Sequence, residues 1–192
     1  MKKILLILIP ILILTGCGKN LNKQYEDMQI GNIESYQLDL RIYGKENKMI
    51  KIDNYKNEEF KIVTNDDTYY VLNGITYKET ENKETKYEKV DEKVFTNTDL
   101  LLQALKNIKS KKEIDNDIKG LDLKLYEVTI DSNYVKSLLK ELGYSEEYSN
   151  ITSKIYLQNN TIYRIEHKID DLKISATFFR VNNIKELNIN VE

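Results

Sequence analysis

The sequence predicts an α+β domain in which a large antiparallel sheet packs against two or three helices. Segments of alternating apolar and polar residues recur from residue 34 onward, turn-forming residues separate them, and two segments with helical spacing interrupt the series. The order of elements is therefore strands, helix, strand, helix, strands, which is typical of α+β proteins with antiparallel pairing. The chain has 192 residues, a length that suits one domain.

The first strands are expected to form a meander with one polar face. In residues 36–42, apolar side chains at every second position alternate with polar ones. Shorter segments of the same kind follow around Ile50, around Phe60 and over residues 69–72. Asn73-Gly74 then predicts a two-residue hairpin turn.

Two amphipathic helices are expected within this series of strands. Residues 96–99 offer N-cap candidates ahead of an apolar run that reaches Ile108. A second helix follows the capping triplet Asp131-Ser132-Asn133 and ends at Gly143. An additional N-terminal helix is expected over residues 20–29.

The remaining segments complete the sheet. Residues 78–93 are almost entirely polar, so we expect a solvated hairpin arm or loop there. Apolar residues change phase within residues 121–130, so either a bulge lies near Tyr126 or both faces of that strand are covered. Closing strands are expected over residues 155–158, 162–169, 172–181 and 184–191.

The N-terminus has the order of a secretory signal, in which charged residues precede an apolar run and small residues follow it. Lys2 and Lys3 precede a run from Ile4 to Leu14. The run is about eleven residues long, well short of the roughly twenty that span a bilayer. Leu14-Thr15-Gly16-Cys17 resembles the lipobox of bacterial lipoproteins, in which a signal peptidase cuts before a cysteine that carries diacylglycerol.

This resemblance divides the chain into three parts and predicts where the protein is located in the cell. Residues 1–16 would be the signal peptide, residues 17–33 the lipidated cysteine, tether and first helix, and residues 34–192 one folded domain. Diacylglyceryl-Cys17 would hold the protein to the extracytoplasmic face of the bacterial cell membrane, because two acyl chains make a stable anchor.

Charge and cysteine content narrow the function further. The formal net charge is −2, and both signs are spread along the chain. This distribution argues against a nucleic-acid partner, which needs clustered Lys and Arg. Cys17 is the only cysteine, so the domain can form no internal disulfide and is expected to depend on packing.

No motif in the sequence predicts an enzyme, a metal site or a cofactor. His167 is the only histidine and shares the apolar phase of its strand, so we expect a hydrogen-bonded structural histidine rather than a general base. Residues 115–120 begin like a calcium loop, but Lys119 and Tyr126 stand where that motif needs oxygen ligands.

The pattern resembles the LolA/LppX-like superfamily of extracytoplasmic lipoproteins and lipoprotein carriers. Residues 35–42, the hairpin 69–77, and residues 155–169 with the strand to Val181 carry the resemblance. It implies a strongly curved antiparallel sheet, an incomplete barrel, wrapped round the helices with an apolar cavity between them. Carriers of that superfamily are soluble, so an anchored chain is expected to bind its ligand at the membrane.

We therefore expect a lipid or another hydrophobic ligand to bind between sheet and helices. The alternative is an envelope protein-interaction module with a dry core and no ligand, whose partner contacts the tyrosines and the charged arm 78–93. The side chains expected to line the cavity are Tyr36, Leu38, Leu40, Ile50, Ile52, Phe60, Ile62, Ile174, Ala176 and Phe178.

Overall fold

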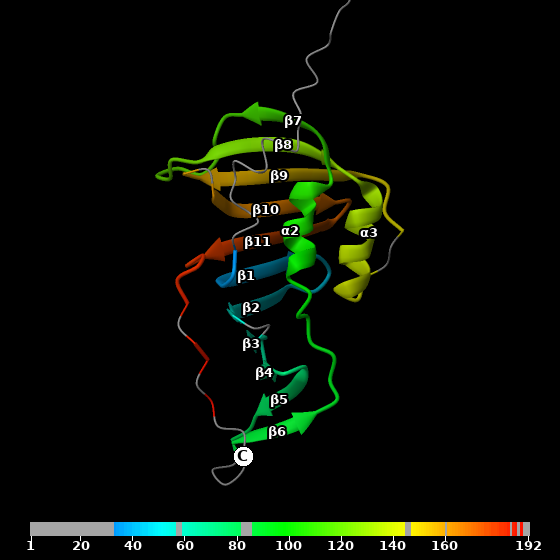
Figure 1. Ribbon diagram of the computed structural model, residues 1–192. Helices are drawn as coiled ribbons and strands as arrows, with labels where there is room; N and C mark the ends of the chain where they lie inside the picture. The colour runs from blue at the N-terminus through cyan, green and yellow to red at the C-terminus, as the bar shows by residue number, and fades with distance from the viewer. Residues whose placement is uncertain are drawn as a thin grey trace, which may run out of the picture.

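In the part of the chain that the structure describes, eleven antiparallel strands form one open sheet, and two helices lie against one of its faces (Figure 1). The structure is a computed structural model that describes residues 33–56, 59–81, 86–144, 147–159, 161–184, 186, 187 and 189. The expected signal peptide, Cys17 and the helix expected over residues 20–29 lie outside the described residues.

The strands follow the chain in two runs, separated by helix α2 (Asp99–Lys106). The first run is β1 (Tyr36–Tyr43), β2 (Lys48–Tyr55), β3 (Glu59–Val63), β4 (Thr68–Leu72), β5 (Ile75–Glu79) and β6 (Tyr87–Val90). The second is β7 (Ile108–Ile114), β8 (Lys124–Ile130), β9 (Ile151–Gln158), β10 (Thr161–Ile169) and β11 (Leu172–Phe179), with helix α3 (Ser132–Glu141) between β8 and β9.

The pairing of the first strand with the last joins the two runs into one sheet. The strand order is β6-β5-β4-β3-β2-β1-β11-β10-β9-β8-β7, and Leu40 pairs with Ala176 at the junction. Strands β6 and β7 lie at opposite edges, so the sheet stays open. The connection from β6 to β7 therefore crosses the whole sheet, and α2 lies on this crossing (Figure 1). The expected α+β fold with an incomplete antiparallel barrel is confirmed.

The core lies between the sheet and the two helices. Alternation along β1 turns Tyr36, Leu38, Leu40 and Ile42 toward the helices, and each is at most 2% exposed. The helices contribute their own apolar faces, because leucines and other apolar residues recur there at helical spacing. These buried helix residues are Leu101, Leu102, Ala104 and Leu105 in α2, and Tyr134, Val135, Leu138 and Leu139 in α3.

Strand β8 is covered on both faces, which confirms one of the two alternatives for residues 121–130. Val128 and Ile130 belong to the main core, whereas Leu125 packs with Leu123 and Tyr156 in a second cluster on the outer face. The pairing of β8 with β9 runs through Tyr126 without a register shift. The apolar residues change phase because Leu125 is buried on the outer face of the sheet, whereas Val128 and Ile130 are buried on the inner face.

The structure differs from the expectation at two boundaries and at one expected strand. The helix expected to reach Ile108 ends at Lys106, and residues 108–114 form β7, whose exposed lysines hide the alternation of a strand. Strand β11 ends at Phe179 because Arg180 and Asn182 have positive φ angles of 47° and 57°. Of the strand expected over residues 184–191, the described residues 184, 186, 187 and 189 are not in a strand.

The charged arm has the expected form of a hairpin. Strand β6 pairs with β5, and Glu79 lies opposite Tyr87. The tip of this arm, residues 82–85, lies outside the described residues.

Candidate functional site

A groove lies between the inner face of the sheet, the connection from β6 to α2 and the end of α3. We call it the apolar groove after the six apolar side chains that line it, and it is also lined by Lys48, Thr64, Tyr69, Glu92, Lys93 and Glu141. Its volume is about 270 Å³. Its apolar lining comes from three sheet strands, the connection and the residue after α3, so segments far apart in sequence meet there. These apolar residues are Ile42, Ile50, Ile62, Val94, Phe95 and Leu142.

Polar contacts hold the connection over this apolar groove. The Tyr69 hydroxyl donates to Glu92 Oε2 at 2.6 Å, and this hydrogen bond raises the pKa of Tyr69. Lys93 Nζ lies 3.1 Å from Glu141 Oε2 near the end of α3. Both pairs join residues just ahead of Val94 to other elements, so they fix where the connection crosses the sheet. The exposed Lys93–Glu141 ion pair contributes about 1 kcal/mol or less.

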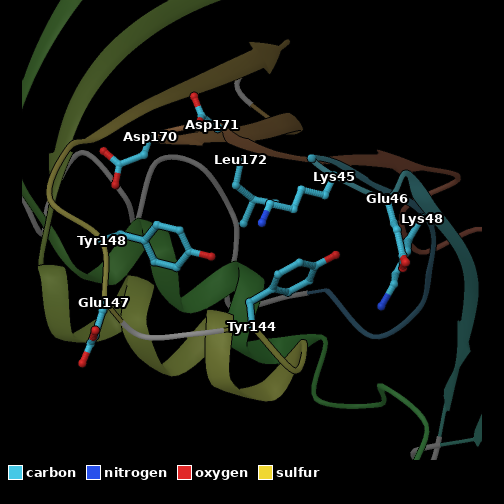
Figure 2. Close-up of a pocket in the computed structure, with 10 residues that line it drawn as sticks. Lys45, Glu46, Lys48, Tyr144, Glu147, Tyr148, Asp170, Asp171 and Leu172 are labelled. Atoms are coloured by element: carbon cyan, nitrogen blue, oxygen red, sulfur yellow. The ribbon is translucent and has the colours of Figure 1, made fainter.

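A larger hollow, which we call the end pocket, lies at one end of the central strands (Figure 2). Its volume is about 600 Å³, within the range of roughly 300–1,000 Å³ that is usual for ligand pockets. Lys48 lines both hollows. The end pocket is lined by Gly44, Lys45, Glu46, Lys48, Tyr144, Glu147, Tyr148, Asp170, Asp171 and Leu172.

Strand register brings the parts of the end pocket together. Tyr43 at the end of β1 pairs with Lys173 near the start of β11, so the β1–β2 turn lies beside the β10–β11 turn. Ile169 pairs with Ile151, which places the start of β9 at the same end of the strands. Tyr144 and Tyr148, which lie between α3 and β9, line the hollow together with residues of both turns.

The end of α3 positions Tyr144. Gly143 has a φ of +77°, a left-handed conformation that glycine adopts without steric cost. The Tyr144 backbone N–H donates to the Leu139 carbonyl at 2.8 Å, and the Gly143 N–H donates to Lys140 at 3.0 Å. This is the Schellman pattern of helix ends. Gly143 thus ends the helix, as expected, and its left-handed conformation also directs Tyr144 into the end pocket.

Three polar groups of the end pocket differ in their contacts: the Asp170 carboxylate, the Lys48 ammonium and the Tyr144 hydroxyl. The Ser149 and Asn150 backbone N–H groups each donate to the Asp170 carboxylate at 3.1 Å, and these bonds lower the pKa of Asp170. Lys48 Nζ lies 5.5 Å from the centre of the Tyr144 ring. The Tyr144 hydroxyl is buried without a hydrogen-bond partner among the described residues, and burial raises its pKa.

The structure gathers the expected lining residues into one core cluster. Ile50 is partly buried and the other nine are at most 9% exposed. Of the ten, Ile50 and Ile62 line the groove, and Phe60 lines a smaller hollow near the start of α2. A ligand contact for the ten stays a prediction.

Sequence reasoning missed several residues that line the two hollows. Val94 and Phe95 follow a polar segment, and Tyr144 and Tyr148 lie in a loop. The available signals were the turn residues at 44–47 and 170–171, which lie at the same end of the central strands once β1 is paired with β11.

His167 is a buried structural histidine, as expected. It is 1% exposed, and its Nδ1 lies 2.8 Å from Ser153 Oγ. Burial lowers the pKa of His167 to about 4, so the ring is neutral at pH 7. Within the described ranges, no group of three or more His, Cys, Asp or Glu side chains is placed to hold a metal ion. Asp117, from the loop that resembled a calcium site, instead accepts from Lys154 Nζ at 2.8 Å.

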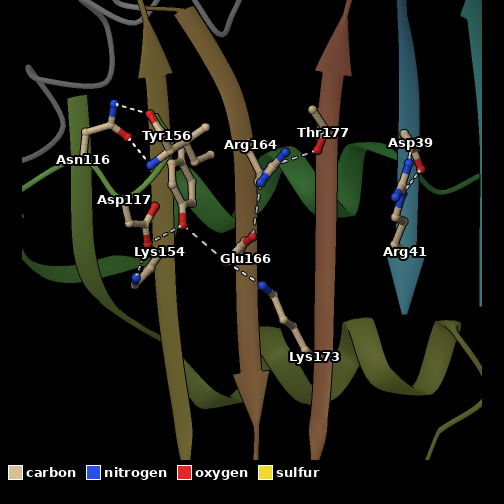
Figure 3. A network of polar contacts seen from close by, with 11 residues as sticks. Asp39, Arg41, Asn116, Asp117, Lys154, Tyr156, Arg164, Glu166, Lys173 and Thr177 are labelled. Carbon is tan, nitrogen blue, oxygen red and sulfur yellow. Dashed lines mark hydrogen bonds and ion pairs between the residues drawn. The ribbon is translucent and has the colours of Figure 1, made fainter. Parts of the chain in front are cut away.

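The outer face of the sheet carries a separate polar network (Figure 3). The Arg164 guanidinium lies over the rings of both Tyr156 and Tyr163, at 5.7 and 5.5 Å from their centres. Arg164 Nε donates to Thr177 Oγ1 at 3.0 Å, and the Tyr156 hydroxyl donates to Glu166 Oε2 at 3.3 Å. These contacts tie strands β9, β10 and β11 together, so we assign the network a structural role.

Neither helix in the described part of the chain is long and apolar enough to cross a membrane.

Comparisons with known proteins identify the fold. No family model matches the sequence, and no curated protein does. LprF from Mycobacterium bovis matches with a TM-score of 0.62 at 11% identity, over 88% of this chain and 97% of that chain. The Mycobacterium tuberculosis lipoprotein LppX matches with a TM-score of 0.54 at 13% identity, over 90% of this chain and 96% of that chain. The chain therefore shares the fold of these two mycobacterial proteins, which confirms the LolA/LppX-like fold expected from the sequence.

Proposed function

We propose that this protein is a membrane-anchored extracytoplasmic lipoprotein that binds a lipid or another hydrophobic ligand between its sheet and helices. The observation that carries the proposal is the apolar groove, whose six apolar side chains come from the sheet, the connection and the end of α3. Apolar side chains beside placed polar groups are the usual composition of a small-molecule site, and in this groove six polar or charged residues accompany the six apolar ones.

The location of the groove supports an apolar ligand in particular. Ile50 keeps exposed surface on the inner face of β2, although its neighbours Leu40 and Ile52 are fully buried. Transfer of apolar surface out of water stabilises a complex by roughly 25 cal/mol per Å². An acyl chain laid along Ile50 and Phe95 would supply that burial. LppX, which shares this fold, is itself described as a lipoprotein.

The lipobox supports the anchor. Cys17 follows Leu14-Thr15-Gly16 at the end of a short apolar segment. A diacylglyceryl group on Cys17 would hold the domain at the membrane surface, where lipids are available to the groove. We propose no catalytic step, cofactor or metal for this protein.

Native mass spectrometry of the intact protein tests the binding function. The protein is extracted from its membrane with a non-ionic detergent and sprayed without denaturation. We expect a population with added mass, which organic extraction removes and identifies as an apolar compound. Consistently empty protein, from several growth conditions, contradicts the proposal.

A second function is favoured by the burial of the expected lining residues. Since nine of these ten residues are at most 9% exposed, they also fit a dry core that serves as a scaffold for protein contacts. In that case the charged hairpin of β5 and β6 would hold an envelope partner. Cross-linking in intact cells discriminates between the two: one specific partner, lost when residues 80–86 are replaced by a short turn, favours the scaffold.

A further inference from the structure

We propose that the end pocket binds an organic ammonium group, carried either by a lipid head group or by a free amine. The proposal rests on the charge, the two aromatic rings and the unpartnered hydroxyl of this pocket, and it holds whether or not the apolar groove is occupied. Only the lipid source of the ammonium group rests on the proposed function.

The charge of the end pocket favours a cation. Four carboxylates and two ammonium groups line it, so its formal charge is negative. The carboxylates belong to Glu46, Glu147, Asp170 and Asp171, and the ammonium groups to Lys45 and Lys48. Hydrogen bonds from Ser149 and Asn150 lower the pKa of Asp170 and keep it ionised. A cationic group would gain from this field, whereas phosphate or a carboxylate alone would be repelled.

The aromatic rings of the two tyrosines can bind such a cation. Tyr144 and Tyr148 project into the pocket from the segment after α3, and Leu172 lies between them and the turns (Figure 2). Aromatic faces attract ammonium groups through the ring quadrupole, and pairs of such rings recognise quaternary ammonium ligands. Lys48 Nζ, 5.5 Å from the Tyr144 ring centre, makes this kind of contact within the chain, so a ligand cation at Tyr144 would have to displace Lys48 or use the opposite face of the ring.

The Tyr144 hydroxyl adds a polar contact for the ligand. It has no hydrogen-bond partner among the residues described, and Glu46 and Tyr148 both act on it electrostatically. An unpaired buried hydroxyl is costly, so a group that bonds to it on binding recovers that cost. A primary ammonium could donate to this oxygen, and a phosphate linked to a choline group could accept from it.

The position of the end pocket explains how one lipid could use both hollows. Lys48 lines the end pocket and the apolar groove, so the two are adjacent. A lipid with its chain along Ile50 would bring its head group past Lys48 toward Tyr144. The Lys48 ammonium would then face the lipid phosphate, while the carboxylates face the head-group cation.

Ligand-detected NMR with the full-length protein in maltoside micelles tests the proposal. Saturation transfer to tetramethylammonium is measured at constant ionic strength and compared among the wild type, Tyr144→Leu, Asp171→Asn and Tyr87→Leu. Tyr87 is the matched control, because Lys86 Nζ lies 5.2 Å from its ring centre but Tyr87 is far from the pocket in the sheet. Asp171→Asn keeps a turn-forming residue and so guards against a folding defect.

We expect the affinity for tetramethylammonium to fall about fivefold in Tyr144→Leu, because a cation–π contact contributes about 1 kcal/mol. Asp171→Asn should also weaken binding, and Tyr87→Leu should leave it within twofold of the wild type. Absence of saturation transfer in the wild type, or an equal loss in Tyr87→Leu, overturns the proposal. Neither result bears on the native mass spectrum, which tests the groove separately.

Two short-chain lipids distinguish the sources of the ammonium group. If it belongs to a lipid, a dihexanoyl lipid with a choline head group should bind at least tenfold more tightly than its glycerol-headed counterpart and than free tetramethylammonium. If it belongs to a free amine, tetramethylammonium should bind as tightly as the choline lipid. Tighter binding of the glycerol-headed lipid than of the choline-headed lipid contradicts the proposal.

Discussion

Ser153 Oγ and His167 Nδ1 lie 2.8 Å apart on neighbouring strands β9 and β10, inside the core. The other ring nitrogen, Nε2, has no hydrogen-bond partner within the described ranges. The centre of the Tyr134 ring lies 6.0 Å from the centre of the imidazole ring. A charged imidazolium would have no carboxylate to face in this setting. The histidine is therefore kept neutral by its surroundings.

His167 predicts a loss of stability in mild acid. Its folded-state pKa of about 4 lies below the ordinary value of 6.5. The unfolded chain therefore takes up the proton first, so the stabilisation is fully present above pH 6.5 and is lost as the pH falls toward 4. The free energy of unfolding should fall by about 2 kcal/mol between pH 7 and pH 5.

Urea unfolding of the wild type and His167→Gln at the two pH values checks this. The glutamine variant is expected to be less stable at pH 7 but to lose less stability between pH 7 and pH 5. Equal losses in both proteins would show that other groups cause the acid sensitivity.

The conformation of Gly143 predicts that a substitution at the end of α3 affects both the stability of the protein and binding in the end pocket. Gly143→Ala should lower the free energy of unfolding by about 1 kcal/mol, because alanine pays a steric cost at positive φ. It should also weaken tetramethylammonium binding, since Tyr144 follows Gly143 directly. Gly120→Ala is the matched control, because Gly120 has a φ of +82° with open space around it. Thermal melts and NMR titrations of both variants should show equal destabilisation but impaired binding only in Gly143→Ala.

The second cluster predicts that the outer face contributes to stability. Leu123 is 6% exposed and packs with Leu125 and Tyr156. Leu123→Ala should therefore destabilise the protein by roughly 2–4 kcal/mol through lost burial and a cavity. Leu121→Ala, at a partly buried position of the same cluster, should cost less. Similar costs in urea titrations of the two variants would contradict the role given to Leu123.

The expected anchor gives a direct prediction for Cys17. Cys17→Ser should abolish incorporation of labelled palmitate and move the protein from the membrane fraction to the extracytoplasmic soluble fraction, because the thiol is the site of diacylglycerol transfer. Membrane association that survives this change would show that another contact holds the protein.

The sequence predicted elements better than it predicted the hollows between them. Strand β1 was readable because its buried and exposed residues alternate strictly. Edge strand β7 was missed, since its sequence IKSKKEI faces solvent at most positions and carries no such pattern. Leu125 and Val128 were ambiguous for a physical reason, as a loop far from the helices covers the outer face there.

The end pocket depends on long-range register, and this is why it could not be predicted. Gly44, Tyr144 and Asp170 lie in three separate loops, each recognisable only as a turn or helix end. They meet because β1 pairs with β11, and β10 with β9. The sequence had no signal for the pairing of β1 with β11. In contrast, the inward direction of Ile50 and Ile62 followed from period-two alternation alone.

Ligand recovery from a pair of variants on strand β2 tests the central claim most directly. Ile50 lines the apolar groove, whereas its neighbour Met49 is 37% exposed and points to the opposite face of the same strand. Wild type, Ile50→Gln and Met49→Gln are purified in parallel, and the apolar compound bound per protein is quantified by native mass spectrometry. We predict that Ile50→Gln loses most of the ligand while Met49→Gln retains it. Equal occupancy in all three proteins, or none in the wild type, would contradict ligand binding in the groove.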